Sequence, residues 1–126
     1  MPRLLLAIAA GGALGSVARY GVALLAQRAH ATFPYGTLAV NVAGSLLLGA
    51  LVRSFASHSS GPTTTQLALT IGLCGGFTTF STFSLDALRL LQSGEHGRAA
   101  AYVAGSVGLS IAAVWLGFLL AARTAR

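Results

Sequence analysis

The sequence has very few of the charged residues with which a water-soluble protein covers its surface. Of its 126 residues, 8% are charged and 55% are hydrophobic. Lysine is absent, and the only acidic residues are Asp86 and Glu95. A chain of this length needs more polar side chains than these to form a soluble domain. The composition therefore predicts a protein that is largely surrounded by lipid.

Residues for metal binding and for catalysis are also scarce. Cys74 is the only cysteine, so a disulfide within the chain is excluded and no cysteine and histidine cluster predicts a metal site. His30, His58 and His96 fall in expected connections, and no grouping of serine, histidine and aspartate indicates a catalytic site. We expect surface histidines, a packed Cys74 and no enzymatic activity.

The apolar residues form four long runs, at residues 4–26, 36–52, 66–91 and 99–122. Each is close to the ~20 residues with which a helix crosses a bilayer. The first run could be a cleaved signal peptide, but its hydrophobicity continues past Arg19, which favours a retained span. We expect an all-α integral membrane protein of four transmembrane helices, a single domain over residues 1–126, placed multi-pass in the cell inner membrane.

All eight basic residues are arginines, and the formal net charge is +6. They occur singly near the ends of the runs, which favours anchoring to lipid headgroups over binding of nucleic acid. In a four-span arrangement, one side carries four of them and the other carries three: Arg3, Arg53, Arg123 and Arg126 against Arg28, Arg89 and Arg98. Because this asymmetry sets membrane orientation, the near tie predicts dual topology and makes an antiparallel homodimer plausible.

Polar side chains within the runs need partners, because lipid offers none. In the second run Thr37, Asn41 and Ser45 are four residues apart and share one helix face. Asn41 either joins two helices or lines a wet path, and the sequence leaves both alternatives open. In the first run Gly11 and Gly15 predict close helix packing.

The last run repeats this spacing with Tyr102, Ser106 and Ser110, which favours a track of hydroxyl donors. Gly105, Gly108 and Gly117 in the same run predict close packing against another helix. Arg19 lies deep in the first run, where it either extends to the headgroups or forms the positive mouth of an anion path.

The third run contains two adjacent glycines, Gly75 and Gly76, followed by β-branched threonines, a combination that disfavours helix. We expect a break near mid-membrane, and the carbonyls freed there, near Gly75 and Thr78, are candidate cation ligands. Beyond the break, Phe80 and Phe83 share a face. The positive edges of their rings could face a small anion, although a packed aromatic pair is the ordinary alternative.

Three motifs, in this order, resemble those of the Fluc (CrcB) family of fluoride channels over the whole chain: Gly12-x2-Gly15-x3-Arg19, Gly36-Thr37-x3-Asn41-x2-Gly44-Ser45 and Gly75-Gly76-x-Thr78-Thr79-Phe80-Ser81-Thr82-Phe83-Ser84. The resemblance implies an antiparallel dual-topology dimer with two fluoride pores along the subunit interface. It also implies a structural Na⁺ on the two-fold axis, bound by the backbone carbonyls of Gly75 and Thr78 from each subunit.

The resemblance further implies roles for individual side chains. Phe80, Phe83 and Asn41 would flank the fluoride path, and Arg19 would attract anions at its vestibule. The polar track would comprise Tyr102, Ser106 and Ser110, and the helix-break motif would include Gly76, Thr79, Ser81 and Thr82. The implied partners are fluoride, sodium, a second copy of the chain and the bilayer.

The resemblance, together with the polar and aromatic residues of the runs, predicts a passive fluoride-selective channel that lowers cytoplasmic fluoride. The only acid inside the runs is Asp86, near an end, which disfavours a proton-coupled carrier that depends on an intramembrane carboxylate. The competing interpretation is a small four-span transporter for organic cations. Those transporters resemble proteins with a glutamate in the first span, and this first span has none.

Overall fold

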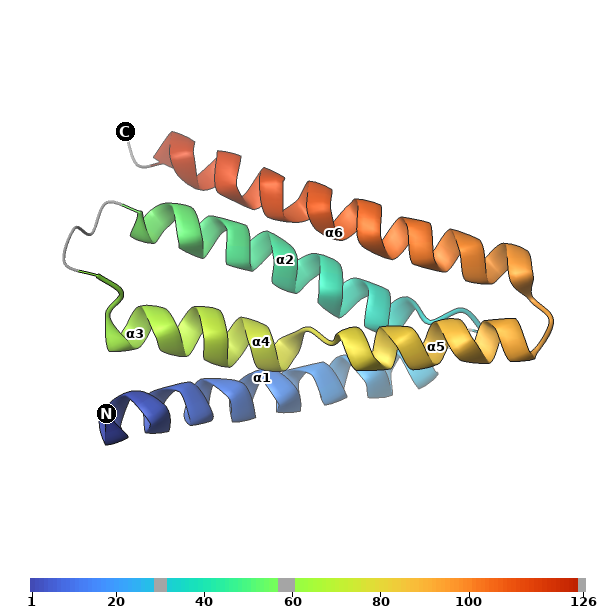
Figure 1. Cartoon of the computed structure of the whole chain (residues 1–126), viewed down its shortest axis with the longest axis horizontal. Coiled ribbons are helices and arrows are strands. Elements are labelled where there is room, and N and C mark those ends of the chain that lie inside the picture. The colour runs from blue at the N-terminus through green and yellow to red at the C-terminus, as the bar shows by residue number, and fades with distance from the viewer. Residues whose placement is uncertain (29–31, 57–60, 125–126) are drawn as a thin grey trace.

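The computed structural model describes residues 1–28, 32–56 and 61–124. The first, second and fourth spans are long continuous helices, and the third span is built from several shorter helices (Figure 1). The elements are α1 (Pro2–Arg28), α2 (Tyr35–Phe55), α3 (Thr64–Leu67), η1 (Ala68–Cys74), α4 (Gly75–Phe77), α5 (Phe80–Gln92) and α6 (His96–Thr124).

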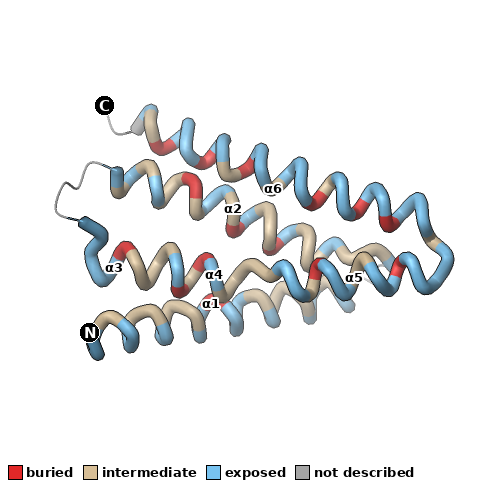
Figure 2. Tube along the Cα trace, viewed as in Figure 1, coloured by how far each residue is buried: buried red, intermediate tan, exposed pale blue. Residues whose placement is uncertain are grey.

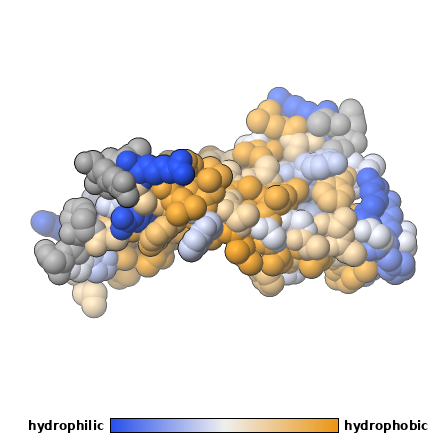
Figure 3. All heavy atoms as spheres, turned by 90° about the horizontal axis from the view of Figure 1, so that it is seen from above, coloured by the Kyte–Doolittle hydropathy of each residue, from blue (hydrophilic) through white to orange (hydrophobic). Residues whose placement is uncertain are grey.

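Within the described ranges, four helical segments are long and apolar enough to cross a membrane: Pro2–Arg28, Tyr35–Phe55, Thr64–Gln92 and His96–Arg123. The predicted four-span, all-α architecture is confirmed, with each span slightly longer than its apolar run. In Figure 1, α2 and α6 run in one direction, and α1 and the third span run in the other. Apolar residues dominate the middle of the surface in Figure 3, and hydrophilic residues gather towards its two ends.

Glycines allow α1 to approach the third span closely. A Cβ at Gly11 would meet the carbonyl oxygen of Ala68, and one at Gly15 would meet that of Leu73. Only a residue without a side chain fits there, since helix backbones touch directly. The predicted role of Gly11 and Gly15 in packing is confirmed, and their partner is the third span.

The seam between α2 and α6 is built in the same way, from Gly49 and Gly117. A Cβ at Gly49 would meet the carbonyl oxygen of Val114, and one at Gly117 would meet that of Leu46. The same prediction is wrong for Gly105 and Gly108 within one subunit, because no atom of another described helix lies within 4 Å of a Cβ placed at either position.

The third span is broken as predicted, but the break falls on the threonines and not on the glycines. Gly75 and Gly76 are helical, whereas Thr78 (φ −86°, ψ 160°) and Thr79 (φ −156°, ψ 117°) are extended. The Thr79 side chain accepts a hydrogen bond from the backbone N–H of Thr82 and so caps α5. Threonine is a favoured N-cap, which explains why the new helix starts here. The π-helical turns of η1 carry no sequence signal.

Most large apolar residues are exposed, as expected for a protein in lipid, and exposed residues recur along the helices in Figure 2. The small buried cluster contains Phe83, Leu90, Ala99 and Tyr102. His96 is exposed, as expected, but it is the first residue of α6 and not part of a connection. His30 and His58 lie outside the described residues.

Candidate ion site at the helix break

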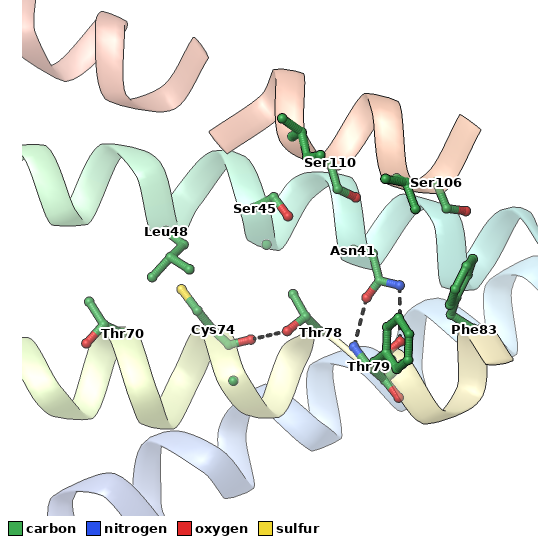
Figure 4. A pocket seen from close by; sticks show the side chains of 15 residues that line it. Asn41, Ser45, Leu48, Thr70, Cys74, Thr78, Thr79, Phe83, Ser106 and Ser110 are labelled. Atoms are coloured by element: carbon green, nitrogen blue, oxygen red, sulfur yellow. Dashed lines mark hydrogen bonds between the residues drawn. The ribbon is translucent and has the colours of Figure 1, made fainter. Parts of the chain in front are cut away.

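Asn41 on α2 holds the break in the third span. The backbone N–H of Thr79 donates to Asn41 Oδ1 at 2.8 Å, and Asn41 Nδ2 donates to the carbonyl of Thr79 at 3.1 Å (Figure 4). One side chain therefore satisfies both backbone groups of a residue that has left the helix, as a break within a membrane requires. The alternative in which Asn41 joins two helices is confirmed, and Asn41 also lines a pocket.

These bonds leave two carbonyls without their usual helical donors. In a continuous α-helix the carbonyl of Gly75 would accept from the N–H of Thr79, and that of Thr78 from Thr82. Instead, the Thr79 N–H donates to Asn41, and the Thr82 N–H donates to Thr79 Oγ1 at 3.2 Å. The carbonyls of Gly75 and Thr78 are the two that the sequence predicted as cation ligands. Their oxygens suit a hard cation, and one subunit supplies only two of the several ligands that such an ion takes.

A further carbonyl freed near the break belongs to Gly76. It accepts a hydrogen bond from Arg19 Nε at 3.1 Å. Arg19 is therefore tied to the third span, and it lines a pocket of about 260 Å³ with Thr37, Thr79 and Thr82 among its neighbours. This pocket has a cation beside hydroxyl groups, and the role of Arg19 in attracting an anion stays a prediction.

The larger pocket, of about 360 Å³, lies between α2, the broken span and α6 (Figure 4). Its lining contains no charged side chain. The structure brings most of the predicted site residues together here: Asn41, Gly75, Thr78, Thr79, Phe80, Phe83, Ser106 and Ser110. Arg19 and Thr82 line the smaller pocket, and Gly76, Ser81 and Tyr102 line neither. Thr70 and Cys74 line the larger pocket and were not predicted to do so.

Phe80 and Phe83 form the predicted pair, with ring centroids 5.3 Å apart. Phe83 is 8% exposed and also packs against Tyr102, at a centroid distance of 5.3 Å. Phe80 is 78% exposed although it lines the pocket. One ring is thus fixed within the subunit, and the other is uncovered at the pocket.

Ser106 is a buried polar residue of this pocket. It is 5% exposed, and its Oγ has no hydrogen-bond partner among the described residues. Buried hydroxyls are almost always bonded. The Ser106 hydroxyl, shielded from solvent at the pocket wall, is therefore a donor without a matched acceptor in this geometry.

The sequence did not reveal a network around Asp86. Thr37 Oγ1 donates to Asp86 Oδ2 at 2.7 Å, and the Tyr102 hydroxyl donates to the same oxygen at 3.4 Å. Tyr102, 1% exposed, thus directs its hydroxyl to Asp86. A general rule could have indicated this network, because a carboxylate in an apolar run needs hydrogen-bond donors. Thr37 and Tyr102 were already recognised as polar residues within the runs.

We expect Thr37→Val to destabilise the protein by about 1.5–3 kcal/mol, as for a lost hydrogen bond to a charged group. Valine keeps the shape of threonine but leaves Asp86 without its shortest bond. Thr37→Ser keeps the hydroxyl and is the matched control. Thermal unfolding in detergent, followed by loss of the folded peak in size-exclusion chromatography, measures the difference. Equal melting temperatures for the valine variant and the wild type would contradict a stabilising role.

Comparison with known proteins places the chain among small membrane proteins. A family model described as "CrcB-like protein, Camphor Resistance (CrcB)" matches residues 6–118. A fluoride-specific ion channel FluC of Nitrobacter winogradskyi is 52% identical over 114 residues, 90% of each chain. The FluC of Paracoccus denitrificans is 50% identical over 117 residues, 93% of each chain. That of Rhizobium meliloti is 50% identical over 118 residues, 92% of this chain and 94% of its own.

Proposed function

This chain belongs to the CrcB-like family, and we propose that it is a fluoride-selective channel through which F⁻ leaves the cytoplasm passively. The observation that carries this proposal is the pocket beside the helix break, which offers hydrogen-bond donors and ring edges without a charged side chain. Similar proteins named fluoride-specific ion channels support it. The organic-cation alternative has no support in these comparisons.

Fluoride is a small, strongly hydrated acceptor, so a path for it must replace water with other donors. The hydroxyls of Ser106 and Ser110, one turn apart on α6 in the pocket lining, are the proposed donors. The second N–H of the Asn41 amide and the ring edges of Phe80 and Phe83 add weaker positive partners. Weak partners let the ion enter and leave, whereas a fixed positive charge would hold it.

Tyr102 and Arg19 have different parts in this account. Tyr102 packs against the Phe83 ring, and the hydrogen bond from its hydroxyl to Asp86 holds Tyr102 in place. Tyr102 thereby fixes the position of the Phe83 ring. Arg19 lines the smaller pocket beside the break, where its charge raises the local concentration of anions at the vestibule. Thr79 and Thr82 line the same pocket. Gly76 and Ser81, which line neither pocket, are proposed to maintain the backbone conformation of the break.

The channel is proposed to be an antiparallel homodimer. Phe80 is largely exposed at the pocket. A second copy across this face would bury Phe80 and complete the wall of the pore. The nearly even arginine count of the two sides supports opposite orientations of the two copies.

The same dimer would hold a structural Na⁺ ion through the carbonyls of Gly75 and Thr78 from each subunit. Their helical donors are bonded elsewhere, so the oxygens are free to bind a cation. When bound, Na⁺ supplies fixed positive charge between the subunits.

Channels of this kind would protect a cell in acidic surroundings. Hydrofluoric acid enters as a neutral molecule and ionises inside, and the anion is then trapped. A passive path in the inner membrane lets the negative interior potential expel it. A deletion strain with unchanged fluoride tolerance would count against this physiological role.

The test of the pore assignment is Phe80→Ile, which keeps an apolar side chain but removes the ring edge. We expect fluoride efflux from proteoliposomes to fall by up to about tenfold, since an aromatic edge contributes on the order of 1 kcal/mol. Phe118→Ile, on α6 outside the pocket lining, is the control and should conduct normally. Unchanged efflux through the Phe80 variant would remove this ring from the path.

Sodium removal tests the cation site separately from conduction. We expect protein purified with N-methylglucamine in place of Na⁺ to dissociate or to melt at a lower temperature, because four carbonyls would then face one another without a cation. Restored Na⁺ should reverse the change, whereas the same concentration of choline should not. A dimer equally stable in both buffers would reject the site.

A further inference from the structure

The two ends of the subunit differ in how their arginines are neutralised. Arg3 in the first turn of α1, Arg53 in the last turn of α2 and Arg123 in the last turn of α6 lie at one end (Figure 1). The two acidic residues of the chain, Asp86 and Glu95, lie beyond the helix break, towards the other end. One end is therefore basic without any acidic side chain of its own.

The positive charge of the other end is largely neutralised within the chain. Arg98 Nη1 lies 2.7 Å from Glu95 Oε2, and Arg89 Nη1 lies 3.8 Å from Asp86 Oδ1. Arg98 also donates to Thr32 Oγ1 at 2.8 Å. Two of the three arginines at that end, Arg89 and Arg98, thus have acidic partners among the described residues.

Arg53 at the basic end is held in place, but it forms no ion pair among the described residues. Its Cζ lies 5.5 Å from the centroid of the Phe118 ring, a cation–π contact. Its Nε is buried and has no hydrogen-bond partner in the part of the chain that the structure describes. A partly covered guanidinium without an anion is unfavourable. The packing therefore fixes this cation at a position where the described residues supply no anionic partner.

The position of Arg53 indicates that the second subunit is not this partner. Gly49, one turn earlier, packs against Val114 on α6, and Phe118 follows Val114 by one turn. Arg53 thus lies where α2 packs against α6, one helical turn beyond the Gly49 contact. The pocket that a second copy is proposed to cover is lined by a different set of α2 residues, Asn41, Gly44, Ser45 and Leu48.

The surroundings of Arg53 fit a lipid. Trp115 stacks on Phe118, with centroids 6.4 Å apart and ring planes at 14°. Trp115 is 66% exposed and Leu119, one turn further, 42% exposed. Exposed aromatic residues of this kind are typical of the membrane interface, and a guanidinium matches two phosphate oxygens at once.

We propose that this end of the α2–α6 seam binds an anionic phospholipid. The phosphate pairs with the Arg53 guanidinium, and an acyl chain lies along Trp115 and Leu119. Arg123, exposed in the last turn of α6, adds positive charge near the headgroup. In the antiparallel dimer one such site faces each leaflet, so a dimer binds two lipids.

Native mass spectrometry and thermal unfolding of the purified dimer, with dioleoyl-phosphatidylglycerol or dioleoyl-phosphatidylcholine added, test this proposal. We expect preferential retention of phosphatidylglycerol, up to two per dimer, and a melting temperature raised by it alone. Arg53→Gln should weaken this binding about fivefold, equivalent to about 1 kcal/mol for one arginine at an anionic surface. Arg98→Gln, which removes one arginine from the neutralised end, is the matched control and should bind as the wild type does.

Several results would overturn the proposal. Equal binding of the two lipids by the wild type would do so without any variant, even if Arg53→Gln fails to fold. Displacement of phosphatidylglycerol by excess inorganic phosphate would indicate a site for soluble anions. Dissociation of the Arg53→Gln dimer with unchanged lipid binding would instead assign this arginine to the subunit contact.

Discussion

Asn41→Asp should abolish fluoride conduction while the four spans remain folded. The aspartate retains an acceptor for the Thr79 N–H but loses the donor to the Thr79 carbonyl. It also places a negative charge in a pocket that has no charged lining. A charge about 6 Å from the anion opposes it by ~3 kcal/mol at an effective dielectric constant of ~20, which corresponds to a loss of about 100-fold in rate.

The matched control is Gln92→Glu, the same exchange of an amide for a carboxylate at the exposed end of α5. Both variants gain one charge, so a general effect on surface potential or insertion would appear in both. Fluoride-electrode recordings from proteoliposomes should show near-normal efflux for Gln92→Glu and almost none for Asn41→Asp. Efflux at the wild-type rate through Asn41→Asp would show that the anion does not pass this pocket.

Gly117→Leu should prevent the subunit from folding stably. A Cβ at Gly117 would already meet the carbonyl oxygen of Leu46 on α2, so a leucine must push two helix backbones apart. Overpacking of this kind typically costs 1–3 kcal/mol and, against backbone, more, out of a total stability of about 5–15 kcal/mol. We expect the variant to be lost as aggregate after detergent extraction.

Gly97→Leu is the control on the same helix. No other part of the described chain lies within 4 Å of a Cβ at Gly97, which is exposed near the start of α6. The yield of monodisperse protein should stay near the wild-type value for Gly97→Leu. If Gly117→Leu gave the same yield, α2 and α6 would not pack in the way described.

Local composition was sufficient to predict the spans and the existence of the break. Four apolar runs of bilayer length leave no other all-α arrangement, and Gly75 and Gly76 followed by threonines disfavour a continuous helix. The position of the break was not predictable in this way. It depends on capping by Thr79 and on the bonds from Asn41, 38 residues away in the sequence.

The missed features have the same physical origin. The partners of Asp86 lie 49 and 16 residues away, on α2 and α6, and periodicity within a single run carries no information on such pairs. Gly105 and Gly108 have the same composition signal as Gly117, yet only Gly117 faces α2 within the subunit. Which face of a helix meets which neighbour is decided by tertiary packing.

The most direct test of the proposed function is efflux from liposomes that contain the purified wild-type protein, driven by a potassium–valinomycin potential. We predict rapid loss of fluoride with no loss of chloride and no uptake of an organic cation such as ethidium. Liposomes that retain fluoride, although the reconstituted protein is folded and dimeric, would contradict the channel; equal loss of fluoride and chloride would contradict its selectivity.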